Sequence, residues 1–179
     1  MLVDELKRTY KGWDGSKQLT NTANRLVRMY EELCWPPERI KLELDREFKV
    51  FENGFDEMLV TGPITVWALC PHHLLPCEFK VIIGCVPAGR VLGLSKFARV
   101  SDILARRPIM QEQYSMELVN EIFTRLKPKG VAVFITGSHG CMSSRGIKQN
   151  SSVVTSAIKG VFEEHPTRDE FFAIARSKF

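Results

Sequence analysis

The sequence predicts an α+β protein in which two helices lie on one face of an antiparallel sheet. Its 179 residues are 44% apolar and 26% charged, which is ordinary for a globular chain and argues against a disordered or fibrous one. A chain of this length can build one domain with a substantial core. From residue 55 onward the hydrophobic pattern reads strand, strand, helix, helix, strand, strand, and this order indicates an α+β layer.

The N-terminal part is predicted to be an arm followed by a helix. Residues 1–20 are polar and poorly periodic, so we expect a loose arm or a frayed helix there. Apolar residues then recur at helical spacing over residues 22–34, and the pair Pro36-Pro37 ends the pattern. Residues 39–69 read as extended chain.

The main elements follow from apolar spacing and from helix signals. Apolar residues alternate over 78–87, as in a strand with one buried face. A short apolar run then ends at Ser95, which we interpret as the cap of a helix that stops before Pro108. The remaining elements are a helix over 112–127, a strand over 131–136, a further strand over 152–162, and a final helix that starts at the capping box Thr167–Glu170.

Charge and hydropathy exclude several classes of protein. The 25 Lys and Arg residues outnumber the 21 Asp and Glu residues by four, a mild excess that fits a site for one small anion at least as well as a nucleic-acid surface. No apolar run approaches the roughly 18–20 residues of a membrane span, and the first residues do not read as a secretory signal. We therefore expect no membrane partner and no nucleic-acid partner.

Cysteine and histidine are clustered. The five cysteines form an odd set, which argues against a disulfide framework and for a reducing, cytoplasmic location. Cys70 and His73 are three residues apart, and His139 and Cys141 form a second pair about 70 residues later. Thiolates with imidazoles favour zinc. The alternative is that the cysteines are buried apolar residues and that the histidines lie in a surface turn.

The number of ligands separates a structural zinc site from a catalytic one. A structural zinc takes four protein ligands, whereas a catalytic zinc leaves one position open for water. If Cys70, His73 and Cys141 bind the metal, His72 and His139 lie beside it. Histidines with a pKa near 6.5 suit proton transfer in that position.

Four segments of the sequence resemble the GTP cyclohydrolase I family in order and approximate spacing. They are Cys70–Pro76, Gly93–Arg99, Arg107–Glu112 and Ser138–Gly146, and the similarity covers roughly residues 20–175. The resemblance implies a tunnelling fold, in which ββααββ units join side by side into a barrel. It also implies a homo-oligomer, commonly a decamer of two pentameric rings, with active sites at subunit interfaces. Residues 1–50 would then be an N-terminal arm and helix, and 51–179 the catalytic domain.

The family hydrolyses GTP to formate and 7,8-dihydroneopterin triphosphate, and the resemblance assigns roles to the metal cluster. It makes Cys70, His73 and Cys141 the Zn²⁺ ligands. It implies that His72 protonates the imidazole nitrogen of the purine as that ring opens. His139 would act on the ribose oxygen when the sugar opens. A further family residue, Ser95, would help the later carbonyl rearrangement.

The resemblance also assigns the substrate contacts. Lys96, Arg99 and Arg145 match the triphosphate contacts, and the first turn of a helix after Ser95 would attract an anion on physical grounds as well. Taken alone, these residues also fit a helix cap and a solvated basic face. A further match, Glu112, would read guanine through two hydrogen bonds, with Gln111 as a secondary contact. A carboxylate at that place also fits a charge favoured by the helix dipole.

The sequence departs from the family pattern at a few positions. Pro71 stands where glutamate is usual, and Gly62-Pro63 replaces a region that often carries a phosphate-binding arginine. Cys77 and the pair Ser143-Ser144 are further departures. Two other functions therefore stay open: a same-fold cyclohydrolase with an altered nucleotide or product, and a non-catalytic zinc or nucleotide-binding ring protein. Folate, biopterin and deazapurine routes could each use the product.

Overall fold

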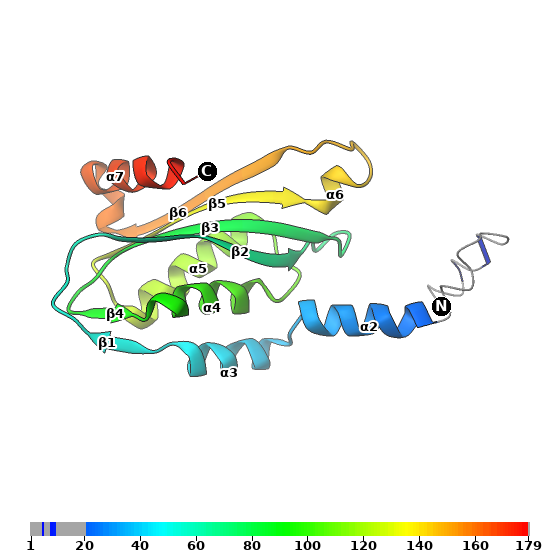
Figure 1. The fold of residues 1–179 in the computed structure, drawn as a ribbon, viewed down its shortest axis with the longest axis horizontal. Coiled ribbons are helices and arrows are strands. Elements are labelled where there is room, and N and C mark those ends of the chain that lie inside the picture. The colour runs from blue at the N-terminus through cyan, green and yellow to red at the C-terminus, as the bar shows by residue number, and fades with distance from the viewer. Residues whose placement is uncertain (1–4, 6–7, 10–20, 179) are drawn as a thin grey trace.

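The computed structural model describes residue 5, residues 8–9 and residues 21–178 (Figure 1). Most of the expected N-terminal arm, residues 1–20, lies outside the described residues. The described helices and strands, in chain order, are α2 (Thr22–Leu33), α3 (Pro37–Glu47), β1 (Val50–Glu52), β2 (Leu59–Leu69), β3 (Pro76–Val86), β4 (Arg90–Leu92), α4 (Leu94–Ala105), α5 (Gln111–Leu126), β5 (Gly130–His139), α6 (Gly140–Ser143), β6 (Ser152–Gly160), the 3₁₀ turn η2 (Val161–Glu163) and α7 (His165–Arg176).

The predicted α+β architecture is confirmed. Strands β2, β3, β5 and β6 form one antiparallel sheet in the order β2-β3-β5-β6. Helices α4 and α5 pack on one face, and α7 covers one end of the other face (Figure 1). Short strands β1 and β4 make a separate antiparallel pair.

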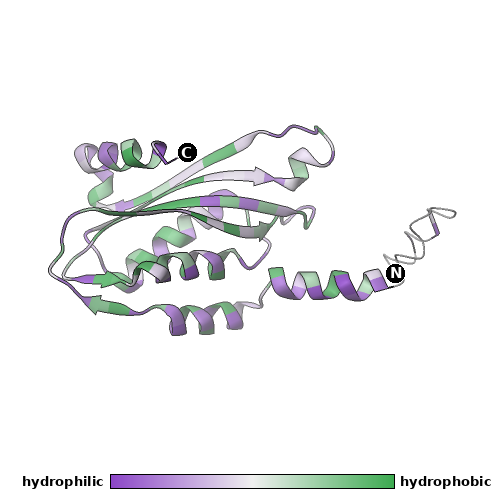
Figure 2. Cartoon of the chain, viewed as in Figure 1, coloured by the Kyte–Doolittle hydropathy of each residue, from purple (hydrophilic) through white to green (hydrophobic). Residues whose placement is uncertain are grey.

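Alternation along the central strands produces two cores. Phe79, Val81 and Ile83 of β3 face the helices α4 and α5, whereas Ile82 faces the other side and packs with Phe171 of α7. Successive side chains of a strand point to opposite faces, so one strand can contribute to both cores. Hydrophobic residues accordingly concentrate on the central strands, while the exposed helices alternate between hydrophobic and hydrophilic residues (Figure 2).

The expectation of extended chain from residue 39 is wrong for its first part, because Pro37–Glu47 is the helix α3. Pro37 lies in the first turn, where its fixed φ suits a helix and its missing N–H is not needed. Ile40 and Leu44 are four residues apart, and both are buried in the main core. The proline pair therefore ends α2 and also begins α3, and α3 packs into the core of the segment 51–179.

Two helix starts also differ from the prediction. Helix α4 begins at Leu94 with Gly93 as its N-cap, so Ser95 lies inside the first turn and is not the cap. Helix α7 begins at His165, with Pro166 in its first turn, so the expected capping box at Thr167 lies within the helix. Neither N-cap residue makes a side-chain capping hydrogen bond, and in α7 the fixed φ of Pro166 suits the first turn.

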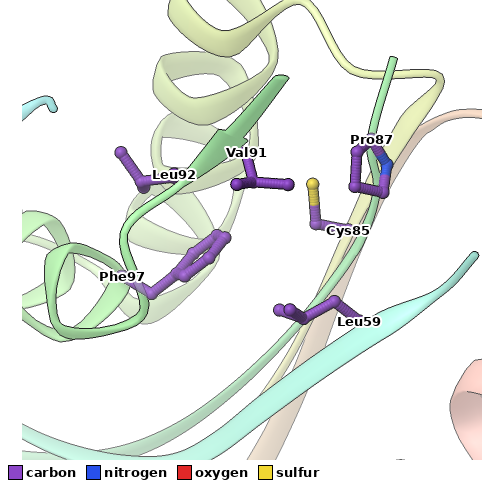
Figure 3. A pocket seen from close by; sticks show the side chains of 6 residues that line it. All are labelled: Leu59, Cys85, Pro87, Val91, Leu92 and Phe97. Carbon is purple, nitrogen blue, oxygen red and sulfur yellow. The ribbon is translucent and has the colours of Figure 1, made fainter. Parts of the chain in front are cut away.

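The core between the sheet and α4 is closely packed. A gap of about 10 Å³ lies among six apolar side chains, one of which is Cys85 (Figure 3). Such a gap holds at most one water and is too small for a ligand. Burial raises the pKa of Cys85 to about 12, which agrees with the packing role expected for this thiol. Among the described helices, none is both long enough and apolar enough to cross a membrane.

Candidate metal centre and active site

Three chain segments meet at one end of the sheet. Cys70 directly follows β2, and His139 is the last residue of β5. Strand β3 lies between them and pairs Cys77 with His139. The antiparallel pairing of β2, β3 and β5 therefore brings together two cysteine–histidine clusters that are about 70 residues apart in sequence.

The turn after β2 holds the first cluster in place. The Cys70 backbone N–H donates to the Leu75 carbonyl at 2.9 Å, and the Leu74 N–H donates to the Cys70 carbonyl at 2.8 Å. Leu74 has a φ of 52°. This left-handed residue closes a tight turn, so that both histidines of the turn lie near the Cys70 thiol.

Cys70, His73 and Cys141 form a set of metal-ligand atoms. Their sulfur and nitrogen atoms all lie within 4.8 Å of one another. The Cys70 Sγ is 3.6 Å from His73 Nδ1. Tetrahedral zinc, with Zn–S near 2.3 Å and Zn–N near 2.0–2.1 Å, places such atoms roughly 3.6 Å apart. The donor set and its spacing therefore fit zinc.

The electrostatics of the thiols point the same way. Burial raises the pKa of the Cys141 thiol, and a hydrogen bond and charge interaction with Cys70 raise it further. The two thiolates disfavour each other unless a cation lies between them. A metal ion would supply that charge and deprotonate both ligands.

A pocket of about 190 Å³ opens beside two of the three ligands, Cys70 and Cys141. Besides Cys70 and Cys141, its lining residues are Pro71, His72, Cys77, Ile109, Met110, Gln111, Glu112 and His139. The structure thus brings both predicted acid–base histidines and the predicted base reader Glu112 to one place. The His72 Nδ1 lies 3.8 Å from the Cys70 Sγ, and His72 is otherwise exposed.

His139 is the more enclosed of the two pocket histidines. Its ring packs against Phe79, with 5.8 Å between the ring centroids. Burial lowers the pKa of His139, and the negative charge of Glu112 partly opposes this shift. The His139 Nε2 lies 2.8 Å from the Gln111 side-chain oxygen Oε1. Burial therefore disfavours the protonated form of His139, and the contact with Gln111 orients its ring.

The sequence matches the profile of GTP cyclohydrolase I over residues 9–176. The chain belongs to this family. A relative from Thermoanaerobacter pseudethanolicus named GTP cyclohydrolase 1 is 38% identical over 164 residues, which cover 89% of this chain and 86% of the relative. The proteins of the same name from Saccharomyces cerevisiae and Homo sapiens are 46% and 43% identical over 126 and 130 residues.

The two eukaryotic relatives are longer than the matched part. This chain covers 52% of the length of each, and 70% and 72% of this chain is matched. Among solved structures, the apo form of archaeosine synthase QueF-Like aligns with a TM-score of 0.41 at 20% identity, over 56% of this chain and 91% of that one. A likeness at that level supports no conclusion about fold or function.

The cations expected at the triphosphate lie in two different places in this GTP cyclohydrolase I homologue. The Arg145 guanidinium is 2.6 Å from His73 Nε2, beside the metal ligands. The Lys96 ammonium is 2.7 Å from Glu47 of α3, and the Arg99 guanidinium is 3.3 Å from the same carboxylate. Lys96, Arg99 and Ser95 belong to the first turns of α4, far from the end of β2 where Cys70 lies (Figure 1). One chain does not unite these residues with the pocket.

Sequence reasoning did not find three features, two of them in this site and one at the start of α4. Gln111 was expected to contact the substrate, which stays a prediction; the structure adds that the residue is 1% exposed and that its amide bonds to protein atoms. Cys77 lines the pocket, and burial together with the neighbouring thiols raises its pKa to about 11. Glu47 pairs with two of the expected phosphate contacts. The alternation of β3 could have placed Cys77 on the buried face with Phe79, whereas its pairing with His139 depends on the β3–β5 register. No local pattern marks Gln111 or Glu47.

Proposed function

We propose that this chain is a zinc-dependent GTP cyclohydrolase I that converts GTP to formate and 7,8-dihydroneopterin triphosphate. The observation that carries the proposal is the set of three metal-ligand atoms next to a pocket that also holds two non-ligand histidines. Family membership supports the same activity. A set of three ligands, among the described residues, leaves a position open, as a catalytic zinc requires.

Cys70, His73 and Cys141 would hold the zinc. When bound, zinc supplies a Lewis acid that activates water for attack at C8 of the purine. Metal binding would also change the contact of Arg145, whose guanidinium donates to His73 Nε2 in this structure. An imidazole that binds metal through Nδ1 carries its proton on Nε2, so two donors would then face each other. Arg145 would turn to another acceptor, and a phosphate of the substrate is a suitable one.

His72 and His139 would move the protons of the reaction. His72 is exposed at the pocket, so it can exchange protons with solvent between turnovers. We assign it the protonation of the purine imidazole nitrogen as that ring opens. His139 is enclosed and has one nitrogen occupied by Gln111, so it can act through its other nitrogen on the ribose oxygen.

Glu112 would select the base. It lies in the first turn of α5, is exposed, and lines the pocket. A carboxylate accepts hydrogen bonds from both N1–H and the 2-amino group of guanine, whereas adenine lacks this pair of donors. The neighbouring Gln111 amide is already engaged within the protein.

The triphosphate site requires a second copy of the chain. A pocket of about 190 Å³ is smaller than the usual ligand site of about 300–1,000 Å³. Lys96, Arg99 and Ser95 lie away from it in the same chain, so a neighbouring subunit would supply them. The sheet ends in β2 and β6, and edge-to-edge joining of such sheets would close the barrel of a tunnelling fold. We therefore propose a homo-oligomer, a decamer by analogy with the family, with active sites between subunits.

A same-fold enzyme with a different nucleotide or product is the second candidate. Its support is Gly62, which lies at an irregularity in β2 with a φ of 122°. A Cβ at Gly62 would lie 2.5 Å from the Val81 carbonyl oxygen, so this backbone excludes the arginine that the family often carries nearby. Triphosphate binding must then rely on the other cations.

One incubation tests the proposal and separates the candidates. The purified protein is mixed with GTP, with and without a zinc chelator, and formate and the pterin product are measured by mass spectrometry. We expect both products in equal amounts, and none after chelation. A ring-opened formyl product would favour the second candidate. GTP binding without turnover would indicate a non-catalytic nucleotide-binding ring. Cytoplasmic location is part of the proposal and agrees with five free cysteines.

A further inference from the structure

We propose that Gln111 is a positioning residue that holds His139 in its Nε2–H tautomer, so that Nδ1 is the nitrogen that exchanges a proton with the substrate. The inference rests on the proposed function, because it names the atom through which His139 acts. It replaces the role as a secondary base contact that the sequence predicted for Gln111.

The Gln111 side chain is enclosed by hydrogen-bonding partners. It is 1% exposed. Its Nε2 lies 3.0 Å from Thr155 Oγ1, 3.1 Å from the Val153 carbonyl oxygen and 3.4 Å from the Ile135 carbonyl oxygen. Its Oε1 lies 2.8 Å from His139 Nε2. The amide nitrogen thus has partners on β5 and β6, and the amide oxygen has a partner on β5.

The partners determine which way the amide points. The Val153 and Ile135 carbonyl oxygens can only accept hydrogen bonds, so the NH₂ group must face them. The reversed amide would bring its oxygen against two carbonyl oxygens and leave a buried NH₂ without these acceptors. An unsatisfied buried polar group costs about 1–3 kcal/mol. The carbonyl acceptors around the amide therefore fix its orientation.

The hydroxyl groups beside the amide agree with this orientation. Ser115 Oγ donates to the Gln111 backbone carbonyl at 2.8 Å and lies 2.7 Å from Thr155 Oγ1. Because the single Ser115 proton is used, Thr155 donates its own proton to Ser115. The Thr155 oxygen is then free to accept from the Gln111 NH₂ group. The two hydroxyl protons of this network each have one position, and the Gln111 NH₂ group shares its two protons among three acceptors.

The tautomer of His139 follows from the amide. Gln111 Oε1 is an acceptor, so the His139 Nε2 that faces it must carry a hydrogen. In the neutral imidazole, the lone pair then lies on Nδ1. The His139 Nε2 therefore does not exchange a proton with the substrate, because its hydrogen is bonded to a buried acceptor.

Gly137 makes room for this contact. It lies on β5, two residues before His139, and a Cβ built on it would overlap Gln111 Oε1 and lie 3.0 Å from His139 Nε2. No side chain larger than hydrogen fits between the amide and the ring. Residues of three elements, α5, β5 and β6, therefore serve one contact.

The test compares Gln111→Leu with Gln113→Leu in the full-length, zinc-loaded protein. Gln113 lies two residues away on the same helix, is exposed, and bonds only to Glu117 among the described residues. Both proteins are labelled with ¹⁵N-histidine, and the His139 signals are identified by their loss in His139→Asn. Solid-state NMR then shows which ring nitrogen carries the proton.

We expect a protonated Nε2 and an unprotonated Nδ1 for His139 in the parent protein and in Gln113→Leu. In Gln111→Leu the two tautomers should mix. The kcat with GTP should fall about 10- to 100-fold, less than after removal of the imidazole, while KM and zinc content stay within about twofold. Gln113→Leu should keep the parent kcat.

Gly137→Ala gives an independent route if Gln111→Leu does not fold, because it displaces the amide without removing it. It should give the same mixed tautomer. A parent His139 with its proton on Nδ1 would overturn the proposal, as would an unchanged tautomer and kcat in Gln111→Leu. Zinc loss in Gln111→Leu would also overturn it, since Gln111 would then support a ligand. The NMR result needs no substrate, so it is decided even if GTP proves not to be the substrate.

Discussion

Glu112→Gln tests base selection by the carboxylate at the start of α5. Glu112 is exposed at the pocket, so its hydrogen bonds to guanine are only partly desolvated. A glutamine keeps one acceptor but turns an NH₂ group toward one guanine donor. Hydrogen bonds to charged groups contribute about 1.5–3 kcal/mol each, and loss of one corresponds to about a 10- to 150-fold lower kcat/KM. Zinc content and oligomeric state should not change.

Inosine triphosphate sharpens this experiment, because it lacks the 2-amino group. The parent protein should prefer GTP strongly, and Glu112→Gln should lose most of that preference. Steady-state kinetics with both nucleotides give the ratio of kcat/KM directly. Unchanged GTP kinetics, or a preserved GTP-to-inosine triphosphate ratio, would refute the role.

The matched control for this variant is Glu38→Gln. Glu38 is likewise an exposed glutamate in the first turn of a helix, α3, but it does not line the pocket. If Glu112 is only a charge favoured by the helix dipole, both variants should lose up to about 1 kcal/mol of stability and neither should lose activity. Equal melting temperatures with unequal kinetics would assign Glu112 to the substrate.

Further variants test the metal, the histidines and the α3–α4 contact. Cys141→Ser should lose zinc and activity while Cys34→Ser keeps both, as measured by metal analysis and formate release; full zinc in Cys141→Ser would show that the third ligand is wrong. His72→Ala and His139→Ala should bind zinc and GTP but turn over about 10²–10⁴-fold more slowly. Only His139→Ala should accumulate a ring-opened formyl intermediate, which mass spectrometry of a single turnover would detect. The hydrogen bond from the Lys96 side chain lowers the pKa of Glu47, and the charge of Arg99 lowers it further. The contacts of ionised Glu47 therefore stabilise the fold above the ordinary glutamate pKa of about 4.3. This stabilisation is lost as the pH falls through the lower pKa of the folded state. The difference in unfolding free energy between the parent protein and Glu47→Gln should therefore shrink over that pH range, and a difference that is constant with pH would contradict this.

Local patterns of the sequence determined most of the secondary structure. The apolar spacing of residues 112–127 predicted α5, and the alternation over 78–87 predicted β3, because amphipathic elements must repeat with the period of their own backbone. The order of elements then restricted the fold to an antiparallel sheet with two helices on one face. The N-terminal boundary at residue 50 stays a prediction. The helix α3 was not predicted, because few of its residues are apolar and only Ile40 and Leu44 are buried.

The metal cluster was also visible in the sequence, because Cys70 and His73 are close enough along the chain to bind one ion. Their partnership with Cys141 was inferred from residue type and family resemblance, since no local spacing connects residues about 70 positions apart. Only the strand pairing supplies the physical link: β3 lies between β2 and β5, and its Cys77 faces His139 in register.

Tertiary structure alone decided what the polar residues do. The family resemblance implied a secondary substrate contact for Gln111, which stays a prediction; burial under β5 and β6 gives its amide internal partners and places its oxygen next to His139. Lys96 and Arg99 are basic residues close to the pocket segments in sequence, yet the start of α4 lies at the opposite end of the sheet from the end of β2 (Figure 1). The direction of an element within the fold sets where its side chains lie, and a pattern of residue types does not contain that direction. The proposal that another copy of the chain completes the site follows from this separation.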